Sequence, residues 1–268
     1  MTDHEPTVTE PSAALRESYD IAGPIGAPVI VFVHGMRLSR SMWAAQMAEL
    51  GDSHRVIAVD LPGHGTLNAR PFTLDAAADQ VATVIETAAN GRAVVVGLSL
   101  GGYVAMEVAA RDPERVRALI LAGASQEPIG LWSIGYRALA TILRWFPVRA
   151  ARFVDRRLFA ARFPRDVADA VISGGFWPRG GAVAVRSLVG KRFVPVLEVY
   201  RGPVLIVNGE YDVMFRAGER RFLKATLDGR RTIIRGATHL TNLDRPDALA
   251  LAVRAFVRRL PAEPGGRA

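Results

Sequence analysis

The chain has 268 residues and a mass of 29.0 kDa, a length that fits one large domain or two small ones. Half of the residues are hydrophobic, which excludes a disordered chain, and the absence of cysteine excludes disulfides, thiolate metal sites and cysteine nucleophiles. The sequence contains no run of about 18 uncharged apolar residues, which is the length that a membrane-spanning helix needs. The polar N-terminus lacks the features of a secretory signal. We therefore expect a soluble, cytoplasmic protein.

The formal net charge of +8 is concentrated in one part of the chain. Between Gln126 and Arg201 there are thirteen basic and five acidic residues, so the rest of the chain is neutral in sum. Such a stretch is either a solvated, arginine-rich helical face or a basic surface that meets acidic lipid or an anionic substrate. No groove-reading motif accompanies the charge, so nucleic acid is not an expected partner.

Short runs of apolar, largely β-branched residues recur along the chain and predict buried strands. The predicted strands cover residues 29–33, 55–59, 93–96, 118–121, 204–207 and 232–234. Helical periodicity is found at residues 41–50, 73–90, 100–111 and 245–260. A weaker pattern at residues 14–22 predicts one or two early strands. This alternation predicts an α/β protein with a mostly parallel sheet and helices on both faces.

The alternation stops between residues 124 and 201, where helices are expected without a clear strand. This segment holds eleven of the twenty aromatic residues. We predict that residues 14–123 and 202–260 form the α/β core and that residues 124–201 form a helical cap or lid inserted between core strands. Residues 1–13 and 261–268 are predicted to be flexible tails.

The sequence Gly97-Leu98-Ser99-Leu100-Gly101 has the pattern G-x-S-x-G and is the strongest functional signal. It follows a predicted strand and opens a predicted helix, which is the setting that a nucleophile elbow needs. The sharp turn lifts the serine hydroxyl above the carboxyl edge of the sheet, and the glycines leave room for it. We predict that Ser99 is a nucleophile. The alternative is a glycine-rich turn with an incidental serine.

A serine nucleophile needs a base, and the chain has five histidines. His34 and His64 stand at strand ends beside glycines, where a structural hydrogen bond is the usual role of a histidine. His239 follows the last predicted strand, at the same edge of the sheet as Ser99. His239 is therefore the predicted base.

The base in turn needs a carboxylate that orients it. Asp212 follows the strand at residues 204–207, and the order serine, aspartate, histidine is the order of the hydrolase sheet. Glu210, two residues earlier, and Glu127, after the fourth strand, remain alternatives. Asp244 is close to His239 in sequence, but we expect it to open the final helix. Asp212 is the predicted acid.

Backbone N–H groups are expected to bind the oxyanion, one from Leu100 after the nucleophile and one from Met36 after the first core strand. Arg37 could enter the pocket to meet an anionic group, or point into solvent. Trp132 and Tyr136 are spaced to share a helix face and could wall an acyl pocket. The alternative is that the cap aromatics only pack the cap onto the sheet.

These segments together resemble the α/β-hydrolase fold superfamily, in particular its compact lidded esterases, lactonases, perhydrolases and C–C bond hydrolases. The matching segments are Val31-Phe32-Val33-His34-Gly35 with Trp43, Asp60 to Gly65, Gly97 to Gly102, Pro203 to Asp212, and His239. They extend from about residue 28 to residue 258. Thr238 departs from the pattern, since many relatives carry glycine before the histidine. The resemblance implies a lid between the sixth and seventh strands of the family's sheet.

The predicted function is hydrolysis of a carboxylic ester, thioester or lactone by a serine hydrolase that forms an acyl-enzyme. Ser99 argues against haloalkane dehalogenases and related epoxide hydrolases, which carry an aspartate nucleophile there. One open alternative is a C–C bond hydrolase, perhydrolase, or lyase or cyclase of secondary metabolism; another is a non-catalytic ligand-binding member. The expected partner is a small-molecule acyl substrate, with no cofactor and no metal. Peripheral contact with acidic surfaces and the oligomeric state stay open.

Overall fold

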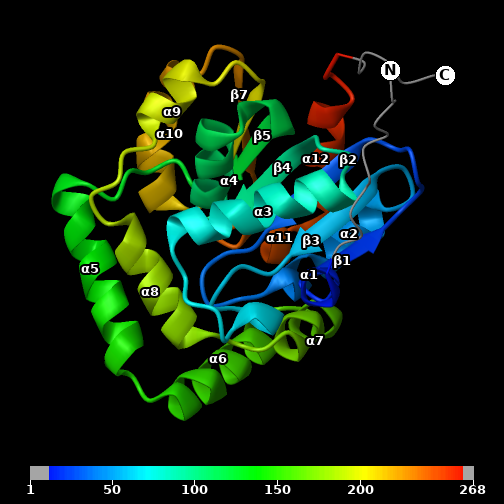
Figure 1. The fold of residues 1–268 in the computed structure, drawn as a ribbon. Coiled ribbons are helices and arrows are strands. Elements are labelled where there is room, and N and C mark those ends of the chain that lie inside the picture. The colour runs from blue at the N-terminus through cyan, green and yellow to red at the C-terminus, as the bar shows by residue number, and fades with distance from the viewer. Residues whose placement is uncertain (1–11, 262–268) are drawn as a thin grey trace, which may run out of the picture.

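The computed structural model describes residues 12–261, which are built around one seven-stranded sheet (Figure 1). The strands are β1 (Tyr19–Ala22), β2 (Val29–Val33), β3 (Arg55–Val59), β4 (Ala93–Leu98), β5 (Val116–Ala122), β6 (Val204–Gly209) and β7 (Gly229–Ile234). Their order across the sheet is β1-β3-β2-β4-β5-β6-β7. β1 runs antiparallel to β3, and every other neighbouring pair is parallel. The prediction of a mostly parallel sheet is confirmed.

Most of the helices alternate with the strands. They are α1 (Ala13–Arg16), α2 (Ala44–Leu50), α3 (Leu74–Ala88), α4 (Leu100–Arg111), α10 (Val213–Ala225), α11 (Thr241–Asp244) and α12 (Pro246–Val257), with 3-10 turns η1 (Arg40–Trp43), η2 (Gly65–Leu67) and η3 (Pro113–Arg115). Successive side chains of a strand point to opposite faces, so Val31 packs with α3, α4 and α10, whereas Phe32 packs with α2 and α12. The sheet is therefore covered on both faces, as predicted.

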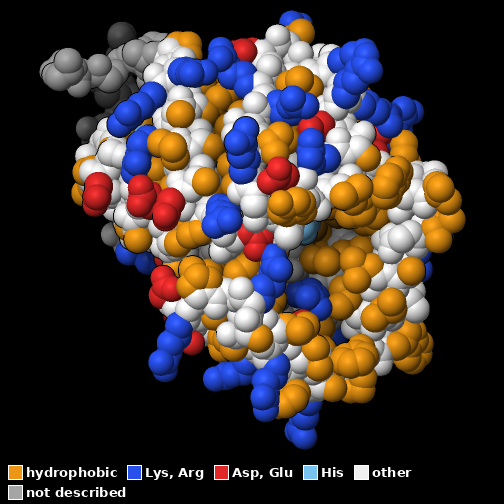
Figure 2. All heavy atoms as spheres, turned by 180° about the vertical axis from the view of Figure 1, so that it is seen from behind, with side chains coloured by type: hydrophobic (Ala, Val, Ile, Leu, Met, Phe, Trp, Pro, Cys, Tyr) orange, Lys and Arg blue, Asp and Glu red, His pale blue; other side chains and the backbone are white. Residues whose placement is uncertain are grey.

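Five further helices lie between β5 and β6, and we refer to them as the insertion. They are α5 (Gly130–Trp145), α6 (Val148–Arg162), α7 (Arg165–Ser173), α8 (Pro178–Leu188) and α9 (Val194–Val199). α5 packs along α8 and α6 packs against α7, and these helices lie beside and below the sheet in Figure 1. α9 instead packs against α4 and α10. Figure 2, seen from behind, shows a hollow bordered by hydrophobic side chains on the side of the insertion.

The elements follow the sequence pattern closely. The strands at residues 29–33 and 55–59 and the helix at residues 100–111 have the predicted bounds. Residues 14–22 hold a single strand, β1, preceded by α1, whose Ser12 side chain accepts the N–H of Leu15. The predicted tails fall mainly outside the described residues. Within the described part of the chain, no helix is both long and apolar enough to cross a membrane.

Candidate active site

Ser99 lies in the turn between β4 and α4, with φ of 53° and ψ of −114°. A side chain in this region of backbone space is strained, and surrounding structure must hold it there. A Cβ on Gly97 would lie 2.2 Å from the carbonyl oxygen of Gly101, and a Cβ on Gly101 would lie 2.1 Å from that of Val33. The two glycines therefore allow α4 to pass close to the sheet, and the serine stands at the carboxyl edge of β4.

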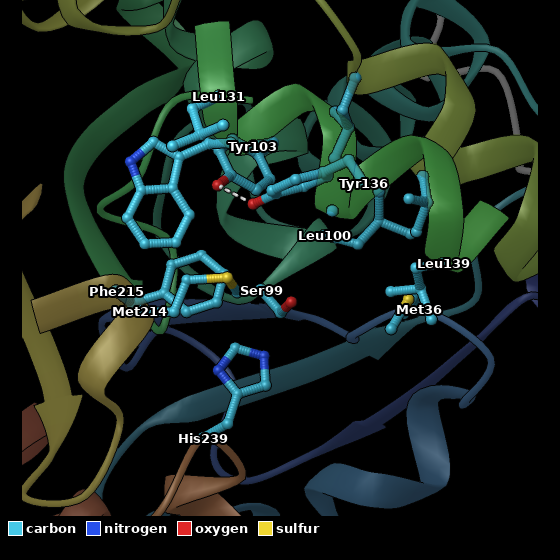
Figure 3. A pocket seen from close by; sticks show the side chains of 14 residues that line it. Met36, Ser99, Leu100, Tyr103, Leu131, Tyr136, Leu139, Met214, Phe215 and His239 are labelled. Atoms are coloured by element: carbon cyan, nitrogen blue, oxygen red, sulfur yellow. Dashed lines mark hydrogen bonds between the residues drawn. The ribbon is translucent and has the colours of Figure 1, made fainter. Parts of the chain in front are cut away.

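His239 and Asp212 form a hydrogen-bonded pair at the same edge of the sheet. Nδ1 of His239 lies 2.8 Å from Oδ2 of Asp212, which is buried, while 33% of the histidine side chain is exposed. Because a carboxylate oxygen can only accept, Nδ1 carries the proton and Nε2 is left as an acceptor. Ser99 and His239 line one cavity, and their side chains face each other in Figure 3.

Two residues that the sequence analysis did not single out hold the imidazole ring. Phe215, in the first turn of α10, stacks on His239 with ring centroids 4.7 Å apart and planes at 17°. Gly123, directly after β5, has φ of +55°, and a Cβ there would lie 2.8 Å from Cε1 of His239. The available signal was a glycine after a strand at the carboxyl edge, and an aromatic residue three positions after Asp212.

The alternative acids make other contacts. Glu127 is buried, accepts the N–H of Phe193 before α9 at 2.8 Å, and pairs with Arg221 at 2.6 Å. Glu210 accepts the N–H of Gly236 at 2.8 Å. Within residues 12–261, Asp212 is the carboxylate that hydrogen-bonds to the ring of the predicted base.

Asp244 does not open the final helix, contrary to the expectation from its sequence position. It ends α11, and α12 begins at Pro246. Its Oδ2 accepts the N–H of Thr238 at 2.7 Å and the Thr238 hydroxyl at 2.6 Å. Its Oδ1 accepts from Arg162 of α6 at 2.5 Å. The departure at Thr238 is thus part of a network that joins the insertion to the residue before His239.

Met36 and Leu100 both line the cavity beside Ser99. Leu100 is the first residue of α4, where an N–H group has no partner within the helix. A Cβ on Gly35 would lie 3.9 Å from Cβ of Ser99, so the loop after β2 passes close to the serine. The N–H of Gly35 is directed at the sulfur of Met42 at 3.3 Å. The N–H of Met36 is therefore the next donor available on this loop.

The cavity has a volume of about 470 Å3 and lies above the serine. Its walls come from Leu131, Trp132, Tyr136 and Leu139 of α5, Val185 and Leu188 of α8, and Met214 and Phe215 of α10. Apart from Ser99, His239 and two tyrosines, the lining side chains are apolar. Trp132 and Tyr136, which the sequence analysis singled out, belong to this wall. The cavity can therefore bind an uncharged, apolar group next to the serine.

The side chains of Tyr103 and Tyr136 are hydrogen-bonded to each other (Figure 3). The Tyr103 hydroxyl donates to the carbonyl of Gln126, so the Tyr136 hydroxyl must donate the 2.9 Å bond between the two phenols. Burial raises the pKa of Tyr136 to about 12, so its hydroxyl stays protonated at neutral pH. The oxygen of Tyr136 keeps lone pairs that can accept from a bound molecule.

Arg37 lies elsewhere than predicted, since it is not among the residues that line the cavity. Its Nη1 lies 3.2 Å from Oδ1 of Asp155 in α6. Asp155 is buried, and burial raises the pKa of its carboxyl. The carbonyl of Arg37 also accepts the N–H of Trp177 at 2.7 Å. The ion pair with a buried partner draws this arginine toward the insertion, so it does not place a cation in the cavity.

His34 and His64 have structural contacts. Nδ1 of His34 lies 2.8 Å from the carbonyl of Gly35, and its Nε2 accepts the N–H of Leu61 at 3.0 Å. Nδ1 of His64 lies 3.0 Å from the carbonyl of Pro62. Burial lowers the pKa of His34 and lowers that of His64 to about 3, so both are neutral near pH 7.

Comparison with known proteins agrees with this architecture. A sequence model of the alpha/beta hydrolase family matches residues 30–253. A pimeloyl-(acyl-carrier protein) methyl ester esterase of Neisseria meningitidis is 30% identical over 91% of this chain and 81% of its own length. 3-Oxoadipate enol-lactonase 2 of Acinetobacter baylyi is 26% identical over 94% of this chain and 96% of its own.

A solved structure shows the same fold. The thermophilic esterase of Thermogutta terrifontis has a TM-score of 0.74 and 24% sequence identity, covering 91% of this chain and 94% of its own. The sheet, the glycine-bounded serine turn and these relatives support one assignment, and the related proteins named here are hydrolases. The chain is a hydrolase and belongs to the alpha/beta hydrolase family.

Proposed function

We propose that this protein is a serine hydrolase that cleaves carboxylic esters with an uncharged acyl group. The observation that carries the proposal is the apolar cavity of about 470 Å3, which ends at Ser99 and His239. The hydrogen bond between His239 and Asp212 supports His239 as the base, because it leaves Nε2 free to take a proton. The methyl ester esterase among the relatives supports an ester as the substrate class.

The reaction follows from this arrangement. The Ser99 hydroxyl attacks the ester carbonyl as Nε2 of His239 takes its proton, and Asp212 stabilises the imidazolium that forms. The N–H groups of Met36 and Leu100 stabilise the oxyanion, aided by the N-terminus of α4. His239 then gives its proton to the leaving alcohol. Water, deprotonated by His239, attacks the acyl-enzyme, and His239 returns this proton to the Ser99 oxygen as the carboxylic acid leaves.

The cavity walls favour an uncharged acyl group. No lysine or arginine is among the lining residues, and Arg37 is paired with Asp155. A carboxylate bound there would lose its hydration without gaining a charged partner, which costs several kcal/mol, on the order of the penalty for an unpaired buried ion. The lactonase relative is named for an enol-lactone of oxoadipate, which keeps one free carboxylate. We therefore favour a neutral ester over a lactone that carries a free carboxylate for this chain.

Helices α5 to α8 form the cap of this proposed site. α5 and α8 supply six of the wall residues named above, and α6 reaches the loop before His239 through Arg162. Acyl groups of different length would therefore differ in their contacts with the cap. Thioesters and lactones with similar apolar groups are further candidate substrates because the same chemistry cleaves them.

The experiment is activity-based labelling combined with turnover. A fluorophosphonate probe should modify Ser99, as located by peptide mass spectrometry, and p-nitrophenyl esters from acetyl to octanoyl should be hydrolysed. Ser99→Ala is the matched control and should lose both labelling and turnover. Labelling at another residue, or ester turnover that persists in Ser99→Ala, would contradict the proposal. Preference for a lactone that carries a free carboxylate over every neutral ester would contradict the substrate class.

A further inference from the structure

The outer corner between α5 and α6 exposes large hydrophobic side chains together with arginines. We define the corner surface as Ile142, Arg144, Trp145, Phe146, Arg149, Phe153, Arg156, Arg157 and Leu158. The exposed fraction is 76% for Trp145 and 61% for both Ile142 and Phe153. Contiguous exposed apolar residues of this size mark an interaction site on a soluble protein.

Helix geometry explains why these residues face outward. The buried side chains of α5 include Tyr136, which lines the cavity, and Ala140, and α5 packs along α8. Phe159 is buried on the inner face of α6. Residues four apart share a helix face, so Arg149 and Phe153 lie together on the opposite, outer face of α6. Each helix therefore packs one face against the rest of the protein and also exposes hydrophobic side chains away from it.

The corner surface has no exposed negative charge. Asp155 is the only acidic residue between Gly130 and Arg162, and it is buried and paired with Arg37. Within residues 12–261, Arg144, Arg149, Arg156 and Arg157 form no ion pair, because every salt bridge found there involves other cations.

Guanidinium groups also lie over the exposed rings. Arg144 is 5.8 Å from the centroid of Trp145, and Arg157 is 5.2 Å from that of Phe153. Figure 2 shows hydrophobic side chains along the side of the molecule that α5 forms, with basic side chains projecting at the bottom. Apolar and positively charged groups are thus interleaved on one exposed corner.

We propose that the corner surface docks on a membrane that contains anionic lipid. The aromatic and aliphatic side chains would enter the boundary between headgroups and acyl chains, while the arginines contact lipid phosphates. An apolar face on a projecting corner suits a deformable lipid surface, whereas a protein partner would need a complementary hollow for each ring. The charge complementarity between the corner surface and anionic lipid comes from the arginines that form no ion pair. This docking is independent of the proposed ester hydrolysis.

The test is co-sedimentation of the full chain with vesicles. We expect the protein to partition onto anionic vesicles of phosphatidylcholine with about 30% phosphatidylglycerol by weight. Partitioning onto vesicles of phosphatidylcholine alone should be at least tenfold weaker. Partitioning should weaken as salt is raised from about 0.05 to 0.5 M, because the Debye length shortens. Equal partitioning onto both vesicles, or none onto either, would overturn the proposal.

Paired variants separate the two contributions. Arg149→Ala with Arg156→Ala should lower partitioning onto anionic vesicles by roughly twenty-five-fold, since each basic residue near the surface contributes about fivefold. Trp145→Ala with Phe153→Ala should lower it at least fivefold. The matched controls Ile25→Ala and Arg230→Ala remove exposed residues outside the corner surface and should change it less than twofold.

Two further outcomes would count against a lipid partner. If the Trp145 and Phe153 variant keeps full partitioning, the aromatic residues do not enter the membrane and the proposed mode is wrong. If the protein binds soluble polyglutamate or heparin but not anionic vesicles, the corner surface recognises an acidic macromolecule instead. A melting temperature within about 3 °C of wild type confirms that each variant is folded, as expected for exposed positions.

Discussion

Gly123 lies against the ring of His239, so that a Cβ at this glycine would stand 2.8 Å from Cε1 and 2.9 Å from Nδ1. The glycine also has φ of +55°, which disfavours any side chain. We predict that Gly123→Ala displaces the imidazole and lowers kcat/KM by roughly 100-fold, since misplacement by about 1 Å can cost that much. Ester turnover and the melting temperature are the measurements.

The control for this prediction is Gly26→Ala. Gly26 has φ of +84°, and nothing lies within 4 Å of a Cβ built there. It therefore carries the same backbone strain without a neighbour, and should lower the melting temperature while leaving kcat/KM within twofold. If Gly123→Ala behaves like Gly26→Ala, contact with His239 has no role in turnover.

Asp244 should act on the reaction through Thr238. Removing its carboxylate leaves the N–H and the hydroxyl of Thr238 without their acceptor, next to His239. We predict that Asp244→Ala lowers kcat by about tenfold with KM changed less than threefold, because the base is displaced but the acyl cavity is not. Asp244→Asn should recover part of this loss, since an amide oxygen can still accept.

The neighbouring Asp247→Ala serves as the control for Asp244. Asp247 is exposed in the first turn of α12 and can weaken only the helix terminus. It should leave kcat unchanged. A uniform fall in kcat for both variants, tracking the melting temperature, would assign Asp244 to stability and not to the position of the base.

The three proposed catalytic side chains should act as one unit. We predict that Ser99→Ala and His239→Ala each lower kcat by on the order of 10³-fold or more, and that the double variant is little worse. Asp212→Asn should lower kcat on the order of 10⁴-fold, because His239 then adopts the wrong tautomer. Glu127 and Glu210 cannot substitute, since both are held by other partners. Additive losses in the double variant would show that Ser99 and His239 act separately.

Much of the sheet could be predicted because its strands are buried on both faces. Such strands appear as continuous apolar runs, and those at residues 29–33 and 55–59 match β2 and β3 to the residue. Residues 14–22 were harder, because β1 is an edge strand with only partly buried or exposed residues. The composition of such a strand resembles that of a loop.

The placement of Ser99, Asp212 and His239 at one edge of the sheet could be predicted because each follows a strand at the carboxyl edge. The position of Arg37 could not, since the buried carboxylate of Asp155 that attracts it lies more than a hundred residues away. Contacts between distant segments leave no periodic signal in a single sequence. The same reason explains Gly123 and Phe215, which matter only because the fold brings His239 against them.

His64 should make the fold sensitive to acid. Burial lowers its pKa to about 3 in the folded state, against about 6.5 for an unfolded histidine. Above about pH 6.5 neither state binds the proton; below it the unfolded state does, so stability falls as pH falls toward 3, by about 1.4 kcal/mol per pH unit. His64→Asn, whose amide can still donate to the carbonyl of Pro62, should lose this dependence.

Urea unfolding at pH 8 and pH 5 measures this effect. The wild type should lose about 2 kcal/mol more free energy of unfolding between these pH values than His64→Asn. His34 is present in both proteins, so its own lowered pKa largely cancels in the comparison. Equal losses in the two proteins would show that His64 titrates normally in the folded state.

The cavity wall should set the preferred acyl length. Each methylene buried against Trp132 and Tyr136 should raise kcat/KM by up to about fourfold, corresponding to about 0.8 kcal/mol, until the cavity is full. Trp132→Ala should flatten this series while leaving acetyl ester turnover nearly unchanged. Tyr136→Phe keeps the apolar wall and loses only the bond to Tyr103, so it should keep the chain-length slope.

Val183→Ala is the control for the wall, because Val183 lies on α8 but outside the cavity lining and is half exposed. It should preserve both the slope and the rates. If Trp132→Ala instead lowers all esters by the same factor and lowers the melting temperature, the tryptophan only packs α5 onto the rest of the protein. A flattened series with an unchanged melting temperature would locate the acyl chain against α5, because stability and acyl binding are then affected separately.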